Sequence, residues 1–175
     1  IEGGEQSHNW YRWSELGNIR DGSHCKVACD HINRIQSDVK LLEKINTETY
    51  RMGVEWSRIE PEEGKFCKKG IEVYRKEIKL LVARGIRPCV TLWHFSNPLW
   101  LEDNGGWTNP KVVQRYLKFV HFVVDQLGDL VQDWVTINEP NVYLLFGYFE
   151  GRWPPGKRGQ LISYLKGATH FAHAH

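Results

Sequence analysis

The amino-acid sequence predicts an α/β fold with a parallel sheet. Three segments rich in β-branched and aromatic residues, 49–59, 86–92 and 134–137, alternate with segments whose apolar residues recur at helical spacing. Apolar strands separated by helices are typical of parallel sheets with right-handed crossovers. No glycine-rich phosphate loop follows any of these strands, which disfavours a dinucleotide-binding fold. The 175 residues have the length of one domain, and no linker divides them.

The first third of the chain is predicted to contain one helix and one strand. Residues 1–35 give no clear signal. A short amphipathic helix is expected over about 35–45, where apolar residues recur at helical spacing. In the strand 49–59, alternation would place Arg51 and Glu55 on one face. Charged residues are unusual on a buried strand, so this face predicts a polar interior near one end of the sheet.

The middle of the chain is predicted to add a helix, a strand and a second helix. The first helix spans 71–82, where apolar residues keep helical spacing until a glycine supplies the stop. The buried strand 86–92 follows and runs into a loop over 95–107 that is rich in Pro, Asn and Gly. The clearest helix of the chain spans 112–127, where apolar residues recur at helical spacing. An Asn-Pro pair precedes its start and a glycine closes it.

The last predicted strand, 134–137, ends in three residues that suit chemistry. Pro140 cannot donate to a sheet and is expected to hold Glu139 extended, so the strand stops there. Asn138 and Glu139 then lie at the carboxyl end of a buried strand, where α/β folds place their active sites. The alternative is a capped strand end whose Glu meets a nearby Arg. The rest of the chain is predicted as loop and then helix, over 147–159 and 161–175.

Composition and charge disfavour several classes of function. Apolar residues make up 41% and charged residues 25% of the chain, as in soluble globular proteins. The formal net charge is +2 and spread along the chain, so neither nucleic acid nor an anionic membrane is an expected partner. No apolar run approaches the roughly 18 residues of a membrane span, and no signal-peptide pattern is present. The 8 Trp, 7 Tyr and 7 Phe suit either sugar-stacking platforms or core filling.

The four cysteines raise the question of a metal. Cys25 and Cys29 have His24 and His31 beside them, a spacing that brings zinc into consideration. No second cysteine pair completes a four-ligand set, and Cys89 lies inside an apolar strand. The sequence therefore favours reduced thiols in a cytoplasmic protein, with no metal and no cofactor.

Short motifs recur along the whole chain in a characteristic order. They are Ile1-Glu2-Gly3, Asp38-Val39-Lys40-Leu41-Leu42, Tyr50-Arg51, Trp56-Ser57-Arg58-Ile59, Val90-Thr91-Leu92-Trp93-His94, Gly105-Gly106-Trp107, Asn138-Glu139-Pro140, Gly147-Tyr148 and Pro154-Pro155-Gly156. This series resembles the retaining β-glycosidases of glycoside hydrolase family one, which are (β/α)8 barrels. The resemblance implies a partial TIM barrel, a single domain over 1–175 with about three parallel strands between the first and fourth helices. The sequences of the motifs at 54–58 and 139–142 resemble those of the archaeal-type branch of the family more than those of plant enzymes.

The resemblance also implies a role for each of four residues. Glu139 would be the general acid/base, which protonates the glycosidic oxygen and later deprotonates water. Asn138 would hydrogen-bond the sugar 2-hydroxyl, and His94 would bind another hydroxyl of the same sugar. Arg51 would sit beside the nucleophile and keep it ionised. Without this resemblance, His94 alone would read as a satisfied core histidine.

The chain departs from the family pattern at several positions. Phe95 stands where a Trp is usual, and Gly53 and Glu55 replace small hydroxyl residues. Glu55 could pair with Arg51, but it is a poor candidate for the nucleophile. The Thr/Ser-Glu-Asn-Gly segment that carries the family's nucleophile is absent from these residues, as is the Gln before Ile1 that would contact the sugar.

Three hypotheses for function follow. The first is part of a glycosidase that hydrolyses terminal β-D-glucosides or galactosides with retention, here with the acid/base but without the nucleophile and so inactive alone. The second is a barrel fragment that assembles with a complementary half-barrel or with another copy of itself, because open sheet edges are adhesive. The third is a non-catalytic sugar-binding relative.

Overall fold

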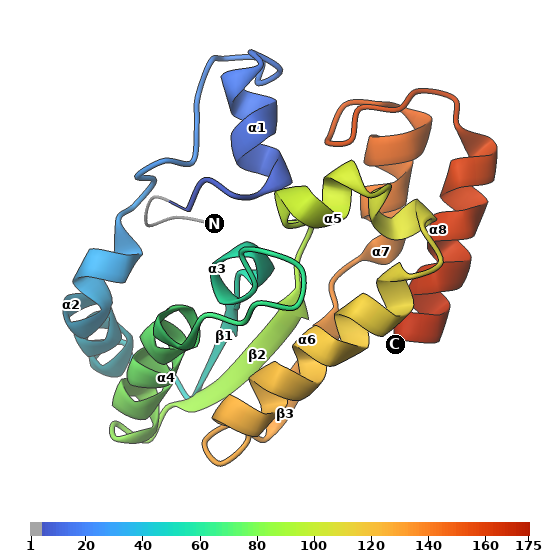
Figure 1. Ribbon diagram of the computed structural model, residues 1–175. Coiled ribbons are helices and arrows are strands. Elements are labelled where there is room, and N and C mark those ends of the chain that lie inside the picture. The colour runs from blue at the N-terminus through green and yellow to red at the C-terminus, as the bar shows by residue number, and fades with distance from the viewer. Residues whose placement is uncertain (1–4) are drawn as a thin grey trace.

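A computed structural model describes residues 5–175 and contains a three-stranded parallel sheet with helices packed around it (Figure 1). The strands are β1 (Thr49–Gly53), β2 (Arg87–Trp93) and β3 (Asp133–Ile137), and they lie side by side in that order. Both strand pairs are parallel. The predicted α/β fold with a parallel sheet is therefore confirmed. The motif Ile1-Glu2-Gly3 lies outside the described residues.

Helices account for most of the remaining chain. They are α1 (Asn9–Glu15), α2 (His31–Lys44), α3 (Trp56–Ile59), α4 (Lys68–Val82), α5 (Leu99–Asp103), α6 (Val112–Leu127), α7 (Pro140–Leu144) and α8 (Leu161–Ala174), with a 3-10 helix over Gly106–Thr108 and a π-helix over Leu145–Phe149. The helices α4 and α6, which connect successive strands, lie on the same side of the sheet (Figure 1). None of the helices in the described part of the chain combines the length and the apolarity that a membrane crossing requires.

The helix α6 has the limits that the sequence predicts. Its buried face consists of residues spaced three or four apart, from Val112 through Tyr116, Phe119 and Val123 to Leu127. The carbonyl and side chain of Asn109 accept hydrogen bonds from the backbone N–H groups of the first turn, as expected of a residue before a helix. The predicted helix over 161–175 is also confirmed, as α8.

Several predicted boundaries are wrong. The strand predicted over 49–59 ends at Gly53, because Glu55 caps α3 and accepts a hydrogen bond from the Ser57 backbone N–H at 3.2 Å. The helix predicted over 35–45 begins at His31 and ends at Lys44. Residues 1–35, for which the sequence gives no clear signal, contain α1. The loops predicted over 95–107 and 147–159 contain or begin with short helices, which are α5, the 3-10 helix and the π-helix.

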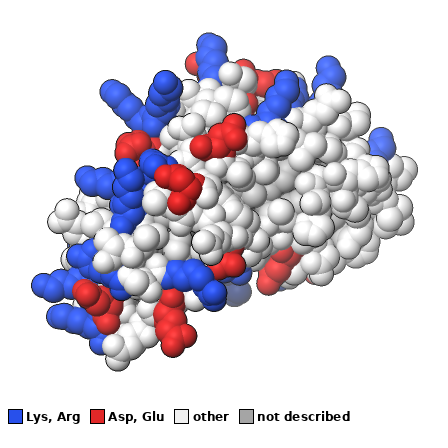
Figure 2. All heavy atoms as spheres, turned by 90° about the horizontal axis from the view of Figure 1, so that it is seen from below, with Lys and Arg blue, Asp and Glu red and all other residues white. Residues whose placement is uncertain are grey.

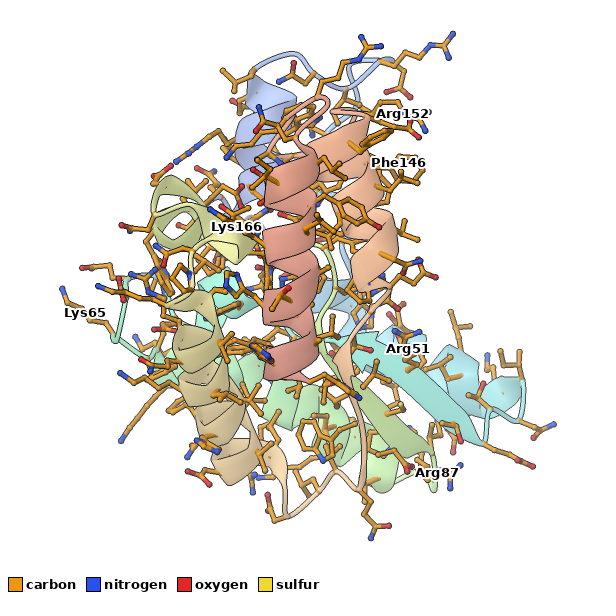
Figure 3. The ribbon with its side chains drawn as sticks, turned by 90° about the vertical axis from the view of Figure 1, so that its right-hand side faces the viewer. Arg51, Lys65, Arg87, Phe146, Arg152 and Lys166 are labelled. Carbon is orange, nitrogen blue, oxygen red and sulfur yellow. The ribbon has the colours of Figure 1, made fainter. Side chains whose placement is uncertain are left out.

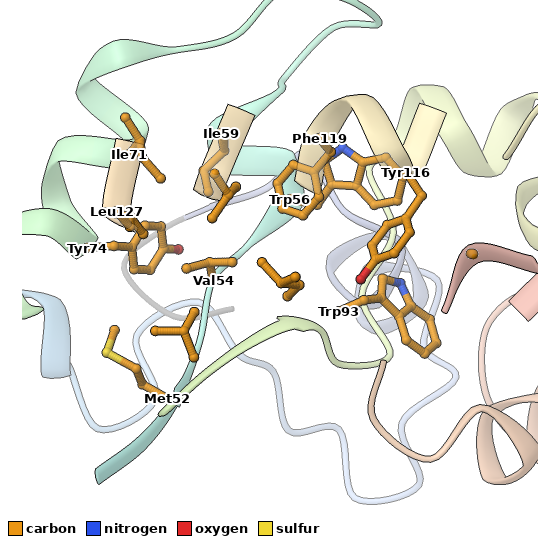
Figure 4. Close-up of a cluster of buried hydrophobic side chains, with 14 of the residues drawn as sticks. Met52, Val54, Trp56, Ile59, Ile71, Tyr74, Trp93, Tyr116, Phe119 and Leu127 are labelled. Carbon is orange, nitrogen blue, oxygen red and sulfur yellow. The ribbon is translucent and has the colours of Figure 1, made fainter. Parts of the chain in front are cut away.

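The core fills the space between the sheet and its covering helices with aromatic side chains (Figure 4). Trp56 stacks on Phe119 with ring centroids 4.9 Å apart. Trp107 stacks in the same way on Phe171 of α8 at 3.8 Å. These pairs connect α3 to α6 and the 3-10 helix to α8, so packing explains these two tryptophans.

The edge strand β3 and the helix α8 leave apolar residues uncovered. All five residues of β3 are half-buried, although the sequence predicts a buried strand. On α8, Leu161, Ile162 and Leu165 are 56%, 71% and 56% exposed. Figure 2 shows one face of the molecule, on which charged side chains of both signs gather at the left. Figure 1 places α2 and α4 on that side. A wide part of this face carries few charges.

Candidate active site

Three neighbouring strands are joined at their carboxyl ends by one arginine. Arg51 of β1 donates from Nε to the Thr91 hydroxyl of β2 at 2.9 Å. It also donates from Nη2 to Oδ1 of Asn138 at 2.6 Å, directly after β3. The Asn138 backbone N–H donates to the Trp93 carbonyl at 3.0 Å and extends the pairing of β2 with β3. Arg51 and Asn138 are thus in direct contact, although 87 residues separate them.

His94 follows β2 directly and lies within electrostatic reach of the same residues. Partial burial lowers the pKa of His94, and the positive charge of Arg51 lowers it further. The negative charge of Glu139 acts on this pKa in the opposite direction. His94 is exposed and not a satisfied core histidine, so its imidazole is accessible to a ligand.

Two residues, Asn138 and Glu139, connect β3 to α7, and Glu139 makes the turn. Its φ is +41° and its ψ is +57°, in the left-handed region, so the prediction of an extended Glu139 is wrong. Pro140 occupies the first helical position of α7, where its missing N–H costs nothing. Glu139 must therefore change direction abruptly to start that helix. Left-handed backbone at a residue other than glycine is costly and is found preferentially at functional sites.

The loop after His94 adds an aromatic wall. Phe95 has a φ of +67°, and its carbonyl accepts a hydrogen bond from Nε1 of Trp10 at 3.0 Å. The Phe95 ring lies 5.1 Å from the ring of Trp153, centroid to centroid. A cavity of about 450 Å³ opens beside them, and His94 and Glu55 contribute to its lining. Trp10 and Trp153 were not singled out from the sequence, because α1 and the loop before α8 reach this site only in the folded chain.

Glu55 lines this cavity, whereas Arg51 is not among the residues that line it. Glu55 is 4% exposed, and its Oε1 accepts hydrogen bonds from the hydroxyls of Ser57 at 2.8 Å and Ser96 at 3.1 Å. The structure thus pairs Glu55 with two serines instead of with Arg51. The sequence signal for this arrangement is a Glu two residues before a Ser at a helix start.

His31, one of the residues considered for zinc, takes other partners. His31 lies between two carboxylates, with Nδ1 at 2.7 Å from Asp38 and Nε2 at 2.8 Å from Glu77. Within residues 5–175, no group of three or more His, Cys, Asp or Glu side chains is placed to hold a metal ion.

Comparison with known proteins shows the same family along the whole chain. The sequence profile described as "Glycosyl hydrolase family 1" matches residues 1–175. Beta-glucosidase A of Acetivibrio thermocellus is 40% identical over 157 residues, which cover 89% of this chain and 35% of the relative. Beta-glucosidase A of Thermotoga maritima is 34% identical with the same coverage.

Solved structures agree with the sequence comparison. The beta-glucosidase from Thermotoga maritima in complex with cyclophellitol superposes with a TM-score of 0.92 at 33% identity, covering 95% of this chain and 38% of the other. The AHE enzyme from Alicyclobacillus herbarius gives a TM-score of 0.95 at 32% identity, covering 100% and 41%. The chain therefore spans 35% to 41% of the length of these relatives, and its sheet is part of a TIM barrel. By its sequence and its fold, the chain belongs to glycosyl hydrolase family 1.

Proposed function

We propose that these residues form the acid/base side of a retaining β-glycosidase active site that hydrolyses terminal β-D-glucosides or β-D-galactosides. Glu139 is the general acid/base, Asn138 and His94 bind hydroxyls of the sugar, and Arg51 lies beside the nucleophile. Retaining hydrolysis needs a second carboxyl about 5 Å from the first. That carboxyl comes from a part of the barrel outside residues 1–175, so these residues alone are inactive.

The observation that carries this proposal is the bridge that Arg51 makes to Asn138. Because Oδ1 of Asn138 accepts the guanidinium bond, its Nδ2 group is left to donate to the sugar 2-hydroxyl. Such a contact strengthens as the oxocarbenium-like transition state forms. Arg51 also brings a fixed positive charge to the sheet edge where a nucleophilic carboxylate must stay ionised.

The reaction has two steps that share one residue. In the first step Glu139 gives its proton to the glycosidic oxygen while the nucleophile attacks the anomeric carbon, and the aglycone leaves as an alcohol. In the second step the carboxylate of Glu139 takes a proton from water, which attacks the same carbon and releases the sugar. Removing the carboxyl therefore affects both steps, but the first step only when the leaving group needs a proton.

The test uses the full-length protein that contains these residues. We expect Glu139→Ala to lower kcat on an alkyl β-glucoside about 10²- to 10⁴-fold, the usual contribution of a general acid/base. With dinitrophenyl β-glucoside, whose leaving group needs no proton, the variant should show a burst of dinitrophenol and then slow turnover. Glu48→Ala, at the opposite end of the sheet, is the control. An equal loss on both substrates, with no burst, would refute the acid/base role.

A second candidate function is assembly. The exposed leucines and isoleucine of α8 lie near a groove lined in part by Ile137, Leu144 and Phe171. Both features leave apolar surface beside α7, α8 and the end of the edge strand β3. A complementary half-barrel or a second copy of the chain would cover it, and the mass of residues 1–175 in solution, alone and mixed with the rest of the barrel, tests this.

Two finer assignments belong to the same proposal. The motifs at 54–58 and 139–142 support a place near the archaeal-type branch, which a tree built from full-length barrels tests. The four free cysteines support a cytoplasmic location, which fractionation of cells that express the full-length protein tests.

A further inference from the structure

Glu55 is a buried carboxylate that the reaction described above does not use. It follows β1 and caps α3, and the backbone N–H of Glu55 itself is held by the hydroxyl of Tyr74 at 3.0 Å. Its Oε1 gathers three donors, which are the Ser57 N–H, the Ser57 hydroxyl and the Ser96 hydroxyl. Two of these donors belong to α3. The third crosses to the loop after β2, 41 residues further along the chain.

That loop carries His94, and hydrogen bonds hold each of the three residues after His94. The Phe95 carbonyl accepts from Trp10 at 3.0 Å, and the Ser96 hydroxyl donates to Glu55 at 3.1 Å. The Asn97 backbone N–H donates to Oδ1 of Asn9 at 3.0 Å. The loop needs such restraints because Phe95 is held in the left-handed region, which a phenylalanine does not adopt without support.

We infer that Glu55 is a positioning residue of the sugar site, which acts through Ser96 to hold the turn that presents His94. The inference rests on the proposed function, in which the His94 imidazole binds a sugar hydroxyl. Ser96 is 6% exposed, so its hydroxyl has little access to bulk water as a replacement for Glu55. Breaking this bond therefore frees the turn and lets the imidazole leave its binding geometry.

Glu55 acts on His94 through geometry and not through charge. The charges that shift the pKa of His94 include those of Arg51 and Glu139, whereas Glu55 is not among them. A glutamine at this position keeps an oxygen acceptor for both serines but carries no charge. We therefore expect Glu55→Gln to retain binding and Glu55→Leu to lose it.

The chain offers a matched pair of variants that separates positioning from stability. Ser57→Ala and Ser96→Ala each delete one hydroxyl bond to the same Oε1, but only Ser96 belongs to the turn that carries His94. In the full-length protein, we expect both variants to lower the melting temperature to a similar extent. Only Ser96→Ala should raise KM for an aryl β-glucoside, about fivefold for one hydrogen bond, with a smaller change in kcat.

A double variant shows whether the effect passes through His94. In the His94→Ala background, Ser96→Ala should change KM by less than a factor of two, because the imidazole that it positions is gone. Equal KM effects of Ser57→Ala and Ser96→Ala, or full additivity with His94→Ala, would overturn the inference.

Hydrogen exchange provides a readout that does not depend on glycosidase activity. Exchange of the peptide covering 94–98 should rise in Ser96→Ala and stay at the wild-type level in Ser57→Ala. If the wild-type protein hydrolysed no β-glycoside but this difference appeared, the proposed function would fail while the restraint on the turn stood. If activity were normal and the exchange of 94–98 did not change in Ser96→Ala, the positioning role would fail alone.

Discussion

His94 can report on its two charged neighbours through its own titration. Arg51→Met removes a positive charge that lowers the pKa of His94, so this pKa should rise. Glu139→Gln removes a negative charge that raises it, so the pKa should fall. Two substitutions with shifts of opposite sign in one ring require that the ring lie near both side chains.

The same Arg51 variant should also lower activity, by an amount that the structure bounds. The guanidinium bond to Asn138 is 2.6 Å long and joins a charged donor to the amide that binds the sugar 2-hydroxyl in the proposed reaction. Hydrogen bonds to charged groups contribute about 1.5–3 kcal/mol, which corresponds to a loss of roughly 10- to 100-fold in kcat/KM. Loss of the positive charge near the nucleophile acts in the same direction.

Arg87→Met is the matched control. Arg87 also reaches across to β3, where its Nε lies 3.2 Å from the carboxylate of Asp133, but at the other end of the sheet (Figure 3). Its side chain is 65% exposed, so this ion pair contributes at most about 1 kcal/mol to stability. We expect kcat/KM and the His94 titration to stay at wild-type values.

The assay is NMR titration of the His94 ring in the full-length protein, together with kcat/KM on an aryl β-glucoside. Shifts of the same sign in Arg51→Met and Glu139→Gln would refute the placement of His94 between the two groups. A wild-type kcat/KM in Arg51→Met would refute the role of the arginine bridge in the reaction.

Two further predictions concern stability. Gly70→Ala should destabilise the protein by about 2 kcal/mol or more in urea unfolding, because the added Cβ would lie 2.2 Å from the Arg58 carbonyl oxygen and only backbone movement can relieve this contact. Burial lowers the pKa of His31, but its bonds to Asp38 and Glu77 outweigh burial, so the pKa is raised in the folded state. The protonated His31 therefore adds to the free energy of unfolding. This stabilisation is present in full below the unfolded pKa of about 6.5 and is lost as pH rises through the pKa of the folded state.

Each of these predictions has a direct check. Gly53→Ala is the control for Gly70, since its added Cβ would meet nothing closer than 3.9 Å, and an equal loss in both variants would contradict the steric argument. For His31, urea unfolding from pH 5.5 to 8.5 should show a fall in stability that His31→Gln abolishes. A fall of the same size in that variant would assign the pH dependence to other groups.

Local sequence patterns predicted the parts of this fold that depend on neighbouring residues. The spacing of apolar residues in 112–127 predicted α6 from end to end, because a helix buries a face whose members lie close in sequence. The same reasoning located β2 to within a residue and predicted that polar residues end β3. It failed over 54–59, where the cap formed by Glu55 prevails over the β-propensity of the surrounding residues.

The amino-acid sequence by itself determined the class of fold, the family and the identity of Arg51, His94, Asn138 and Glu139 as candidate site residues. Only the tertiary structure decided how they meet, because the hydrogen bonds of Arg51 and Glu55 join residues 40 to 87 positions apart. No local pattern records which strand end a side chain will face once the sheet has closed. For that reason the left-handed turn at Glu139 and the restraint of Ser96 by Glu55 became visible only in the folded chain.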